Sequence, residues 1–434
     1  MIKTVYINLW DKRVGAVAWD NSAGVGSVEF EPSFFSNQWD LAPVQMPLRQ
    51  AGRRVFTFPG LRESKAFKGL PGLLADSLPD RYGHTLINAW LSRRGRPTDS
   101  MNPVETLCFI GKRGMGALEF EPAIPGESNQ SSTIEINDLV HIANEILAGR
   151  QKFATDLTKN EEKALVDILK IGTSAAGARA KAVVAFNAKT LEIRSGQTLA
   201  PEGFTQWLIK FDGVADTHFG SGSGYGRVEM AYHLMAVDAG IDMTECRLLE
   251  ENERAHFMTR RFDREPDNTK IHVQSFCAMQ HFDFNNIESY SYEQLFETMR
   301  LLGLPYPQAE ELFRRMVFNV LSRNCDDHTR NFAFLMDKSG IWKLSPAFDL
   351  CHSYRPESAW VSRQSLSVNG KREKITRDDL LSVARAMNIK KAAAIVNQIN
   401  AVVENWPGYA ETTNVNSSLR DAIAKTLIIL TPQY

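Results

Sequence analysis

A dense polar segment, residues 324–331 (Asn-Cys-Asp-Asp-His-Thr-Arg-Asn), limits the possible folds of this chain more than any other stretch. Before it, residues 310–321 carry apolar side chains three and four positions apart, which is typical of an amphipathic helix. After it, residues 332–336 (Phe-Ala-Phe-Leu-Met) are a short apolar run, which indicates a buried strand. The pattern predicts a polar loop packed against the core. An ordinary hydrated turn is the alternative, because Asp and Asn are common turn residues.

Two residues of this segment, Asp326 and Asn331, have the D-x-x-x-x-N spacing of protein kinase catalytic loops. In such loops the carboxylate accepts the proton of the substrate hydroxyl, and the amide binds Mg²⁺. Further along, Asp349 is a lone acid in an apolar stretch, where a second metal ligand is expected. His328, between them, either contacts phosphate or holds the turn.

A second informative stretch, residues 172–181 (Gly-Thr-Ser-Ala-Ala-Gly-Ala-Arg-Ala-Lys), leads into an apolar run typical of a strand. Small residues let backbone N–H groups approach phosphate oxygens, and Lys181 supplies positive charge. The stretch is not a Walker A loop, because Ala178 and Arg179 stand where Lys and Ser or Thr are required. Lys210 lies in a further predicted strand, where it either reaches the sheet edge or has an anionic partner.

The order of predicted elements, strands up to about residue 265 and helices afterwards, indicates an α+β chain. We predict a two-lobed, protein-kinase-like fold. It has a small N-terminal β module (residues 1–128), a β-rich N-lobe (129–266) and an all-helical C-lobe (267–434). In this plan Lys181 and Lys210 neutralise phosphate charge.

The remaining roles follow from the same plan. Asn331 and Asp349 hold Mg²⁺, Asp326 orients and deprotonates a hydroxyl, and the strand near Arg260 and Phe262 offers backbone groups to adenine.

The composition excludes several classes of protein. The 434 residues include 50 Lys and Arg against 51 Asp and Glu, a formal net charge of -1 that attracts neither nucleic acid nor membrane surfaces. The five cysteines form no C-x-x-C pair, which favours a reducing compartment and no structural zinc. The N-terminus lacks the features of a signal peptide, and no apolar run is long enough for a membrane helix. We therefore expect a soluble, cytoplasmic protein.

Together the motifs resemble the HipA family of bacterial serine/threonine kinase toxins. The common protein kinase signatures His-Arg-Asp, Asp-Phe-Gly, Ala-Pro-Glu and Val-Ala-Ile-Lys are absent. The segments that carry the resemblance are residues 174–181, 209–210, 261–264, 326–332 and 344–349, with residues 13–15, 73–77 and 110–117 in the N-terminal module.

The resemblance implies an ATP- and Mg²⁺-dependent kinase of a type II toxin–antitoxin system that phosphorylates a protein serine, in the best-known members of an aminoacyl-tRNA synthetase. It implies a small helix-turn-helix antitoxin of the HipB type, operator DNA contacted only through that antitoxin, and no membrane. It also implies autophosphorylation at Ser174, next to Thr173. The implied ATP-binding residues are Ala175, Ala176, Gly177, Lys181, Lys210, Arg260, Phe262, His328, Asn331 and Asp349.

The chain departs from the family pattern at two places. Arg179 and Ala180 replace a Gln-Glu pair, and Asp327 replaces a glycine. Two other classes of function stay open on the sequence. One is a metal-dependent phosphodiesterase or nuclease using Asp326, His328 and Asp349. The other is a non-enzymatic, nucleotide-binding or repressor-binding scaffold.

Overall fold

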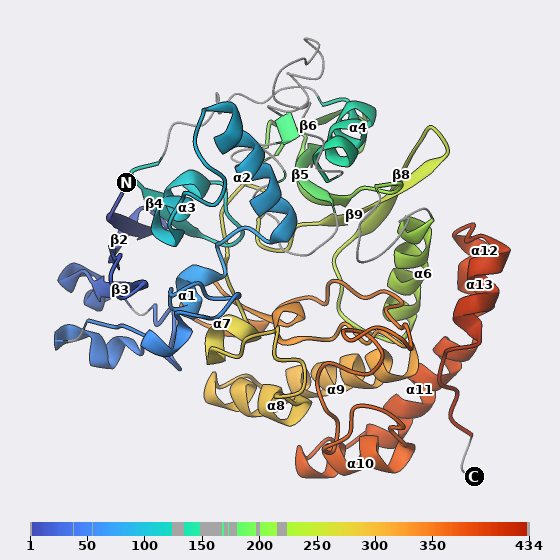
Figure 1. Cartoon of the computed structure of the whole chain (residues 1–434). Helices are drawn as coiled ribbons and strands as arrows, with labels where there is room; N and C mark the ends of the chain where they lie inside the picture. The colour runs from blue at the N-terminus through green and yellow to red at the C-terminus, as the bar shows by residue number, and fades with distance from the viewer. Residues whose placement is uncertain are drawn as a thin grey trace. The chain divides into compact units, whose positions relative to one another are not determined.

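A computed structural model describes residues 2–37, 39–53, 55–123, 134–147, 167–168, 172, 180–196, 200–214 and 224–431. The chain forms two compact units (Figure 1). Unit 1 contains Met1–Leu41, Met46–Gly226 and Glu245–Val273, and unit 2 contains Ala42–Gln45, Arg227–Thr244 and Gln274–Tyr434.

Unit 1 begins with a four-stranded antiparallel sheet of order β3-β2-β1-β4. Its strands are β1 (Thr4–Leu9), β2 (Lys12–Asp20), β3 (Val25–Phe30) and β4 (Leu118–Glu121). Leu9 pairs with Lys12, so Trp10 and Asp11 alone make the turn, and both have positive φ (47° and 62°). That geometry belongs to the tight turn whose twist matches a β-hairpin. The alternating apolar residues at 4–9 and the apolar run at 14–19 predict a hairpin, which is confirmed.

Short 3₁₀ segments and three helices complete the region before β4. The segments are η1 (Pro32–Ser36), η2 (Leu48–Arg53) and η3 (Pro59–Leu61), and the helices are α1 (Gly72–Ala75), α2 (Arg81–Arg93) and α3 (Pro103–Ile110). Helix α2 begins after Asp80, whose side chain accepts a hydrogen bond from the Gly83 N–H, and α3 begins after Asn102 in the same way. Both are N-caps that satisfy a free N–H of the first helical turn.

The second sheet of unit 1 has the order β6-β5-β7-β9-β8. It consists of β5 (Lys181–Phe186), β6 (Ile193–Ser195), β7 (Thr205–Lys210), β8 (Cys246–Glu251) and β9 (Arg254–Arg260), with α4 (Ile136–Leu147) before it. One apolar core joins this sheet to α2, α3 and α4. From α2 it includes Tyr82 and Leu86, and from the sheet Val184, Trp207 and Ile209. The early helices therefore share a core with the later sheet.

Unit 2 is mainly helical. Its helices are α6 (Tyr225–Asp238, from Arg227), α7 (Phe276–Gln280), α8 (Tyr292–Leu301), α9 (Tyr306–Leu321), α10 (Arg377–Ala386), α11 (Ala392–Glu404), α12 (Trp406–Thr412) and α13 (Ser417–Ala424). A three-stranded sheet has the order β10-β11-β12, and the chain passes from unit 1 to unit 2 within β10 (His272–Ser275). Because β11 (Ala333–Met336) and β12 (Trp342–Leu344) lie in unit 2, the predicted C-lobe is not all-helical.

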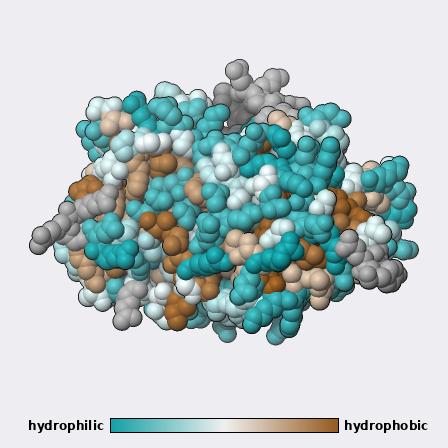
Figure 2. Space-filling model, turned by 90° about the horizontal axis from the view of Figure 1, so that it is seen from below, coloured by the Kyte–Doolittle hydropathy of each residue, from teal (hydrophilic) through white to brown (hydrophobic). Residues whose placement is uncertain are grey.

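The α+β fold class is confirmed. Residues 376–379 (Thr-Arg-Asp-Asp) place an acid three positions after Thr376, which predicts the start of a helix, and α10 begins there with a capping box between Thr376 and Asp379. Residues of the predicted module and of the N-lobe share unit 1, whereas residues 227–244 belong to unit 2. The boundaries at residues 128 and 266 stay predictions. Figure 2 shows a face on which hydrophilic residues predominate and hydrophobic ones are scattered. Within the described ranges, no helix has the length and apolar character needed to span a bilayer.

Candidate functional site

The two predicted phosphate-contacting lysines occupy neighbouring strands of unit 1. Lys181 begins β5 and Lys210 ends β7, and the antiparallel register places them directly opposite each other. Side chains at directly opposed positions share one face of a sheet. Like charges so placed destabilise the pairing unless anions neutralise them. The sheet therefore presents two positive charges on one face.

Lys181 is buried, with 2% of its surface exposed. Its Nζ lies 3.2 Å from Oδ2 of Asp80, which is also buried. The other oxygen of Asp80 accepts the hydrogen bond of 2.7 Å from Gly83 that caps α2. Sequence reasoning missed Asp80, because the two residues are a hundred positions apart and nothing local marks their pairing.

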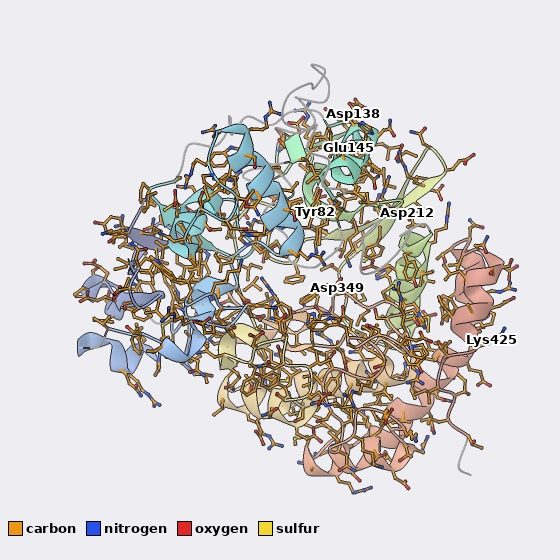
Figure 3. All side chains as sticks on the ribbon, viewed as in Figure 1. Tyr82, Asp138, Glu145, Asp212, Asp349 and Lys425 are labelled. Atoms are coloured by element: carbon orange, nitrogen blue, oxygen red, sulfur yellow. The ribbon has the colours of Figure 1, made fainter. Side chains whose placement is uncertain are left out.

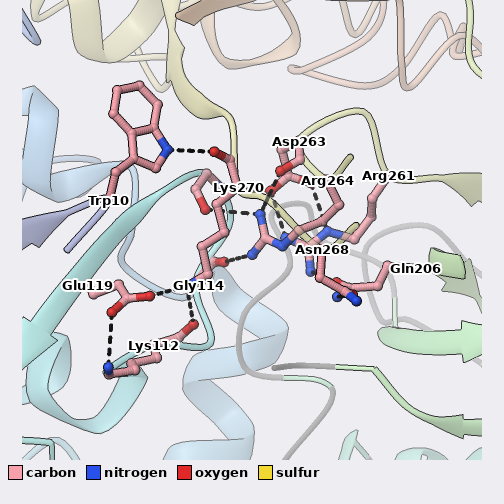
Figure 4. A network of polar contacts seen from close by, with 11 residues as sticks. Trp10, Lys112, Gly114, Glu119, Gln206, Arg261, Asp263, Arg264, Asn268 and Lys270 are labelled. Atoms are coloured by element: carbon pink, nitrogen blue, oxygen red, sulfur yellow. Dashed lines mark hydrogen bonds and ion pairs between the residues drawn. The ribbon is translucent and has the colours of Figure 1, made fainter. Parts of the chain in front are cut away.

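The segment after β9 carries a buried ionic network (Figure 4). Asp263 accepts hydrogen bonds from Arg261 (2.8 and 2.6 Å), from Arg264 (2.7 Å) and from the Gly116 N–H (2.7 Å). Burial alone would raise the pKa of Asp263, but the two guanidinium groups hold it well below its ordinary value. Arg264 in turn donates to the carbonyl oxygens of Gly114 and Gly116, each at 3.0 Å. Segments 150 residues apart are thereby joined by charge-assisted hydrogen bonds.

A second group of contacts extends this network along the same segment. The Lys270 ammonium donates to the Lys112 carbonyl oxygen at 2.7 Å and to Glu119 at 2.8 Å, and the Trp10 indole donates to the Lys270 carbonyl oxygen at 2.6 Å. Arg260, at the end of β9, pairs with Trp207 of β7. The strand predicted near Arg260 to Phe262 ends at Arg260, and the two residues after it lead into the network through Arg261.

The polar segment that opened the sequence argument lies in unit 2, between α9 and β11. Residues Thr329–Asn331 form the 3₁₀ turn η5. The Asn331 side-chain N–H donates to the Asp326 carbonyl oxygen at 2.7 Å, which leaves the Asn331 amide oxygen as a ligand atom. The Asp326 side chain is 37% exposed, so the predicted catalytic base is accessible from the surface.

His328 lies close to the predicted base without bonding to it. Its Nε2 is 3.9 Å from Asp326 Oδ1, which is too long for a hydrogen bond. Its ring lies 5.2 Å from the ring of Phe284. The ring contact fits a residue that holds the turn, whereas Nδ1 is buried without a hydrogen-bond partner among the described residues, so these contacts do not decide between the two roles that the sequence left open.

Asp349 has a left-handed backbone, with φ of 56°. A non-glycine residue in that region is uncommon, and such residues are often found at functional sites. Backbone contacts hold the chain on both sides of Asp349. Before it, the Ala347 N–H donates to the Asp242 carbonyl oxygen at 2.7 Å, and after it, Ser353 pairs with Asn324 in a parallel bridge. The loop that carries Asp349 is therefore paired with the loop that leads into Asp326.

The neighbour of the predicted base, Asp327, is buried and was not identified as a site residue from the sequence. Its carboxylate accepts hydrogen bonds from the Tyr292 hydroxyl (2.7 Å), the Gln364 amide (3.0 Å) and the Ser365 N–H (2.7 Å). Burial raises the pKa of Asp327 to about 6, although these three donors act to lower it. The sequence marked it only as a departure from the family pattern, which has a glycine there.

Other predicted residues lie outside the described part of the chain. These are Ser174, Ala175, Ala176 and Gly177, together with the neighbouring Thr173. Among the described residues, no group of three or more His, Cys, Asp or Glu side chains is placed to hold a metal ion. The alternative of a nuclease that binds metal through Asp326, His328 and Asp349 gains no support from this geometry.

Fold and motifs together define a class of chain with a HipA-type N-terminal module and a kinase-like body. Residues 173–406 match the model of the HipA-like C-terminal domain, and residues 5–121 match that of the HipA N-terminal domain. Because the first match covers more than half of the sequence, the chain belongs to the HipA family.

Individual relatives agree with this assignment. A protein of Sinorhizobium fredii that bears the provisional kinase name Y4dM is 23% identical over 54% of this chain. A provisionally named kinase of Haemophilus influenzae is 28% identical over 26% of the chain. The matched regions span only 58% and 36% of those two relatives.

Among solved structures, the chain is similar to HipA of Shewanella oneidensis, solved with HipB and its operator DNA. The TM-score is 0.66 at 16% identity, covering 97% of this chain and 94% of that one. At this identity the likeness establishes the fold.

Proposed function

We propose that this protein is an ATP-dependent serine/threonine protein kinase of toxin–antitoxin type. In this proposal Lys181 and Lys210 bind the ATP phosphates, and Asp326 orients and deprotonates the acceptor hydroxyl. Arg260 and Phe262 lie beside the adenine, and the phosphate-binding residues include Ala175, Ala176, Gly177 and His328.

The observation that carries the proposal is the register of the two lysines. Lys181 and Lys210 face each other across β5 and β7. Two opposed positive charges on one face of a sheet favour a ligand with several negative charges, and a triphosphate is such a ligand. A scaffold that binds only a repressor gives no reason for this pair, and the assays below separate a kinase from a nuclease.

The residues present fit Mg²⁺, which prefers carboxylate and amide oxygens. The amide oxygen of Asn331 is left for a ligand because its N–H group donates to Asp326, and Asp349 supplies a carboxylate on the adjoining loop. When bound, Mg²⁺ neutralises phosphate charge. The protein groups orient the hydroxyl and accept its proton.

We further propose that Ser174 is an autophosphorylation site, with Thr173 as the competing position. A phosphate there adds about two negative charges among groups that bind ATP phosphates, so it silences the kinase by repulsion. The Ser174→Ala variant then loses most self-labelling and keeps activity on a target. Detection of the phosphate elsewhere by mass spectrometry contradicts this site.

The partner and target follow from the family. We propose a HipB-type helix-turn-helix antitoxin that restrains the kinase and brings it to operator DNA, since the similar Shewanella oneidensis HipA was solved with HipB and operator DNA. The proposed substrate is a serine of a protein, with an aminoacyl-tRNA synthetase as the first candidate to assay.

The test is transfer of label from γ-labelled ATP to the protein itself in Mg²⁺. We expect labelling of the wild type, loss of labelling in Asp326→Asn, and unchanged labelling in Asp337→Asn, an exposed acid in the turn after β11. No labelling of the wild type, or equal labelling of Asp326→Asn, contradicts the proposal. Nucleic-acid cleavage without ATP that survives Lys210→Ala supports the nuclease instead. Partner binding indifferent to nucleotide supports the scaffold.

A further inference from the structure

We propose that helix α2 of the N-terminal module acts in nucleotide binding, and that Asp80 is the positioning residue that holds Lys181 toward the phosphates. This inference rests on the proposed kinase function. Tyr82, labelled in Figure 3, marks the α2 end concerned. Asp80 and α2 belong to the stretch that matches the HipA N-terminal domain, whereas Lys181 belongs to the stretch that matches the HipA-like C-terminal domain.

The first observation is that the two carboxylate oxygens of Asp80 have different partners. Oδ1 accepts the capping hydrogen bond from Gly83 at 2.7 Å, and Oδ2 lies 3.2 Å from the Lys181 ammonium. Because the cap holds the carboxylate in one orientation, the second oxygen has a defined position. A defined anion gives the flexible lysine side chain a defined position too.

The second observation concerns Gly172, which lies on the other side of residues 173–179 from Lys181. A Cβ added at Gly172 would lie 2.5 Å from Leu86 Cδ1, 3.3 Å from Tyr82 Cε1 and 3.4 Å from the Lys181 carbonyl oxygen. The glycine is therefore needed for close packing against α2. The start of α2, with its N-cap Asp80, thus contacts Gly172 and Lys181, which lie on either side of residues 173–179.

Charge explains why a carboxylate stands at this place. Lys181 approaches the N-terminal end of α2, where the helix dipole is positive, and it also faces Lys210 across the sheet. Both neighbours repel a buried ammonium group. Asp80 offsets the repulsion and allows Lys181 to stay charged inside the core.

Protein kinases in general use a lysine–carboxylate pair to place a phosphate-binding lysine, with the acid on a helix of the same lobe. Here the acid comes from the N-terminal module, which gives that module a role in ATP binding. Substitutions at the start of α2 are then expected to weaken ATP binding, even though they leave the predicted ATP-contacting residues unchanged.

The experiment is calorimetric titration of the full-length protein with MgATP. Asparagine at position 80 keeps the cap and removes the charge. We expect Asp80→Asn to weaken MgATP binding about tenfold, because a phosphate-binding group is displaced. The matched control is Asp99→Asn. Asp99 is exposed and also bonds to α2, through His84 (2.6 Å) and Asn88 (3.0 Å). We expect the MgATP affinity of this variant to stay within about twofold of the wild type.

A double-mutant cycle with Lys181→Met separates positioning from general damage. If Asp80 acts through Lys181, the variant with both substitutions binds MgATP no more weakly than Lys181→Met alone. The inference is overturned if the affinity losses of the two single variants multiply in the double variant. It is also overturned if Asp80→Asn binds MgATP with wild-type affinity. A folded wild type that neither binds MgATP nor labels itself contradicts the proposed function, whereas a wild type that does both with an unaffected Asp80→Asn contradicts only this inference.

A second pair of variants decides the matter if Asp80→Asn fails to fold. Gly172→Ala places a methyl group against Leu86, and Leu86→Ala removes the atom that it meets. We expect Gly172→Ala to weaken MgATP binding about tenfold and the combined variant to recover part of it. Wild-type affinity in Gly172→Ala, or no recovery in the combined variant, counts against α2 as the supporting element.

Discussion

Tyr292 of α8 donates a 2.7 Å hydrogen bond to Asp327, the residue after the proposed catalytic base. The Tyr292 hydroxyl accepts in turn from Asn319 at 3.0 Å, and Asn319 accepts from Asn324 at 3.0 Å. Asn324 also reaches the Asp349 carbonyl oxygen, at 3.5 Å. A buried chain of polar groups therefore links the loop of the proposed base to that of the proposed metal ligand, and such chains make loop positions specific.

The titration of Asp327 gives a prediction about pH. Its pKa is raised to about 6 in the folded protein, against about 3.9 in an unfolded chain. Between these values the folded state holds a proton that the unfolded state has lost. The stabilisation from that proton is complete below about pH 4, is lost as the pH rises through about 6, and amounts to about 3 kcal/mol.

Urea unfolding of the wild type and Asp327→Asn across this pH range measures the effect. Because the wild type loses this stabilisation as the pH rises, we expect the destabilisation caused by the substitution to be largest near pH 4 and to shrink toward pH 7. If the difference in the free energy of unfolding between the two proteins does not change with pH, Asp327 is ionised over the whole range.

Lys210→Met is expected to change ligand binding far more than stability. Asp80 offsets the charge of the opposed Lys181, so the free energy of unfolding without nucleotide should change by no more than about 0.5 kcal/mol. The same substitution should abolish most MgATP binding, because one of the proposed phosphate contacts is lost. Denaturant unfolding and calorimetric titration of one preparation report both. If binding is retained, the lysine pair does not serve a nucleotide.

The buried network around Asp263 makes a prediction about stability. Asp263→Asn leaves two buried guanidinium groups without their carboxylate, so we expect a loss of about 3–5 kcal/mol in the free energy of unfolding. The loss should change little with added salt, since buried charges are poorly screened. The control is Glu63→Gln, which breaks an exposed pair with Arg62 and should have no measurable effect. A small or salt-sensitive loss for Asp263→Asn contradicts the network's role.

Elements with strong local signals could be predicted from the sequence. The stretch 67–80, punctuated by Gly and Pro, predicts a turn that leads into a helix over about residues 81–93, and α2 covers those residues. From the sequence we predict that residues 417–430 form the last helix, whereas α13 ends at Ala424. Residues after it make tertiary contacts instead, such as the Ile428 N–H with the Leu321 carbonyl oxygen. Local periodicity does not report such contacts.

The candidate site could likewise be predicted only in part. Lys181 stood out at the end of a loop of small residues and Lys210 as a charge in an apolar strand, but their register depends on how the strands pair. Asp80 as the partner of Lys181, and Tyr292 as the partner of Asp327, result from tertiary packing between distant segments. The left-handed backbone of Asp349 has no local signal, since it is imposed by the surrounding hydrogen bonds.

That backbone allows a selective test of Asp349. Asparagine tolerates positive φ better than most residues, so Asp349→Asn should keep the wild-type free energy of unfolding. It removes the charge that we assign to Mg²⁺ binding, and phosphate transfer should fall at least about a hundredfold. Asp349→Ala should lose transfer similarly and also lose about 1–2 kcal/mol of stability to backbone strain. Self-labelling and urea unfolding of both variants, with Asp337→Asn as the control, separate the two effects. If Asp349→Asn labels itself at the wild-type rate, the carboxylate has no part in the reaction.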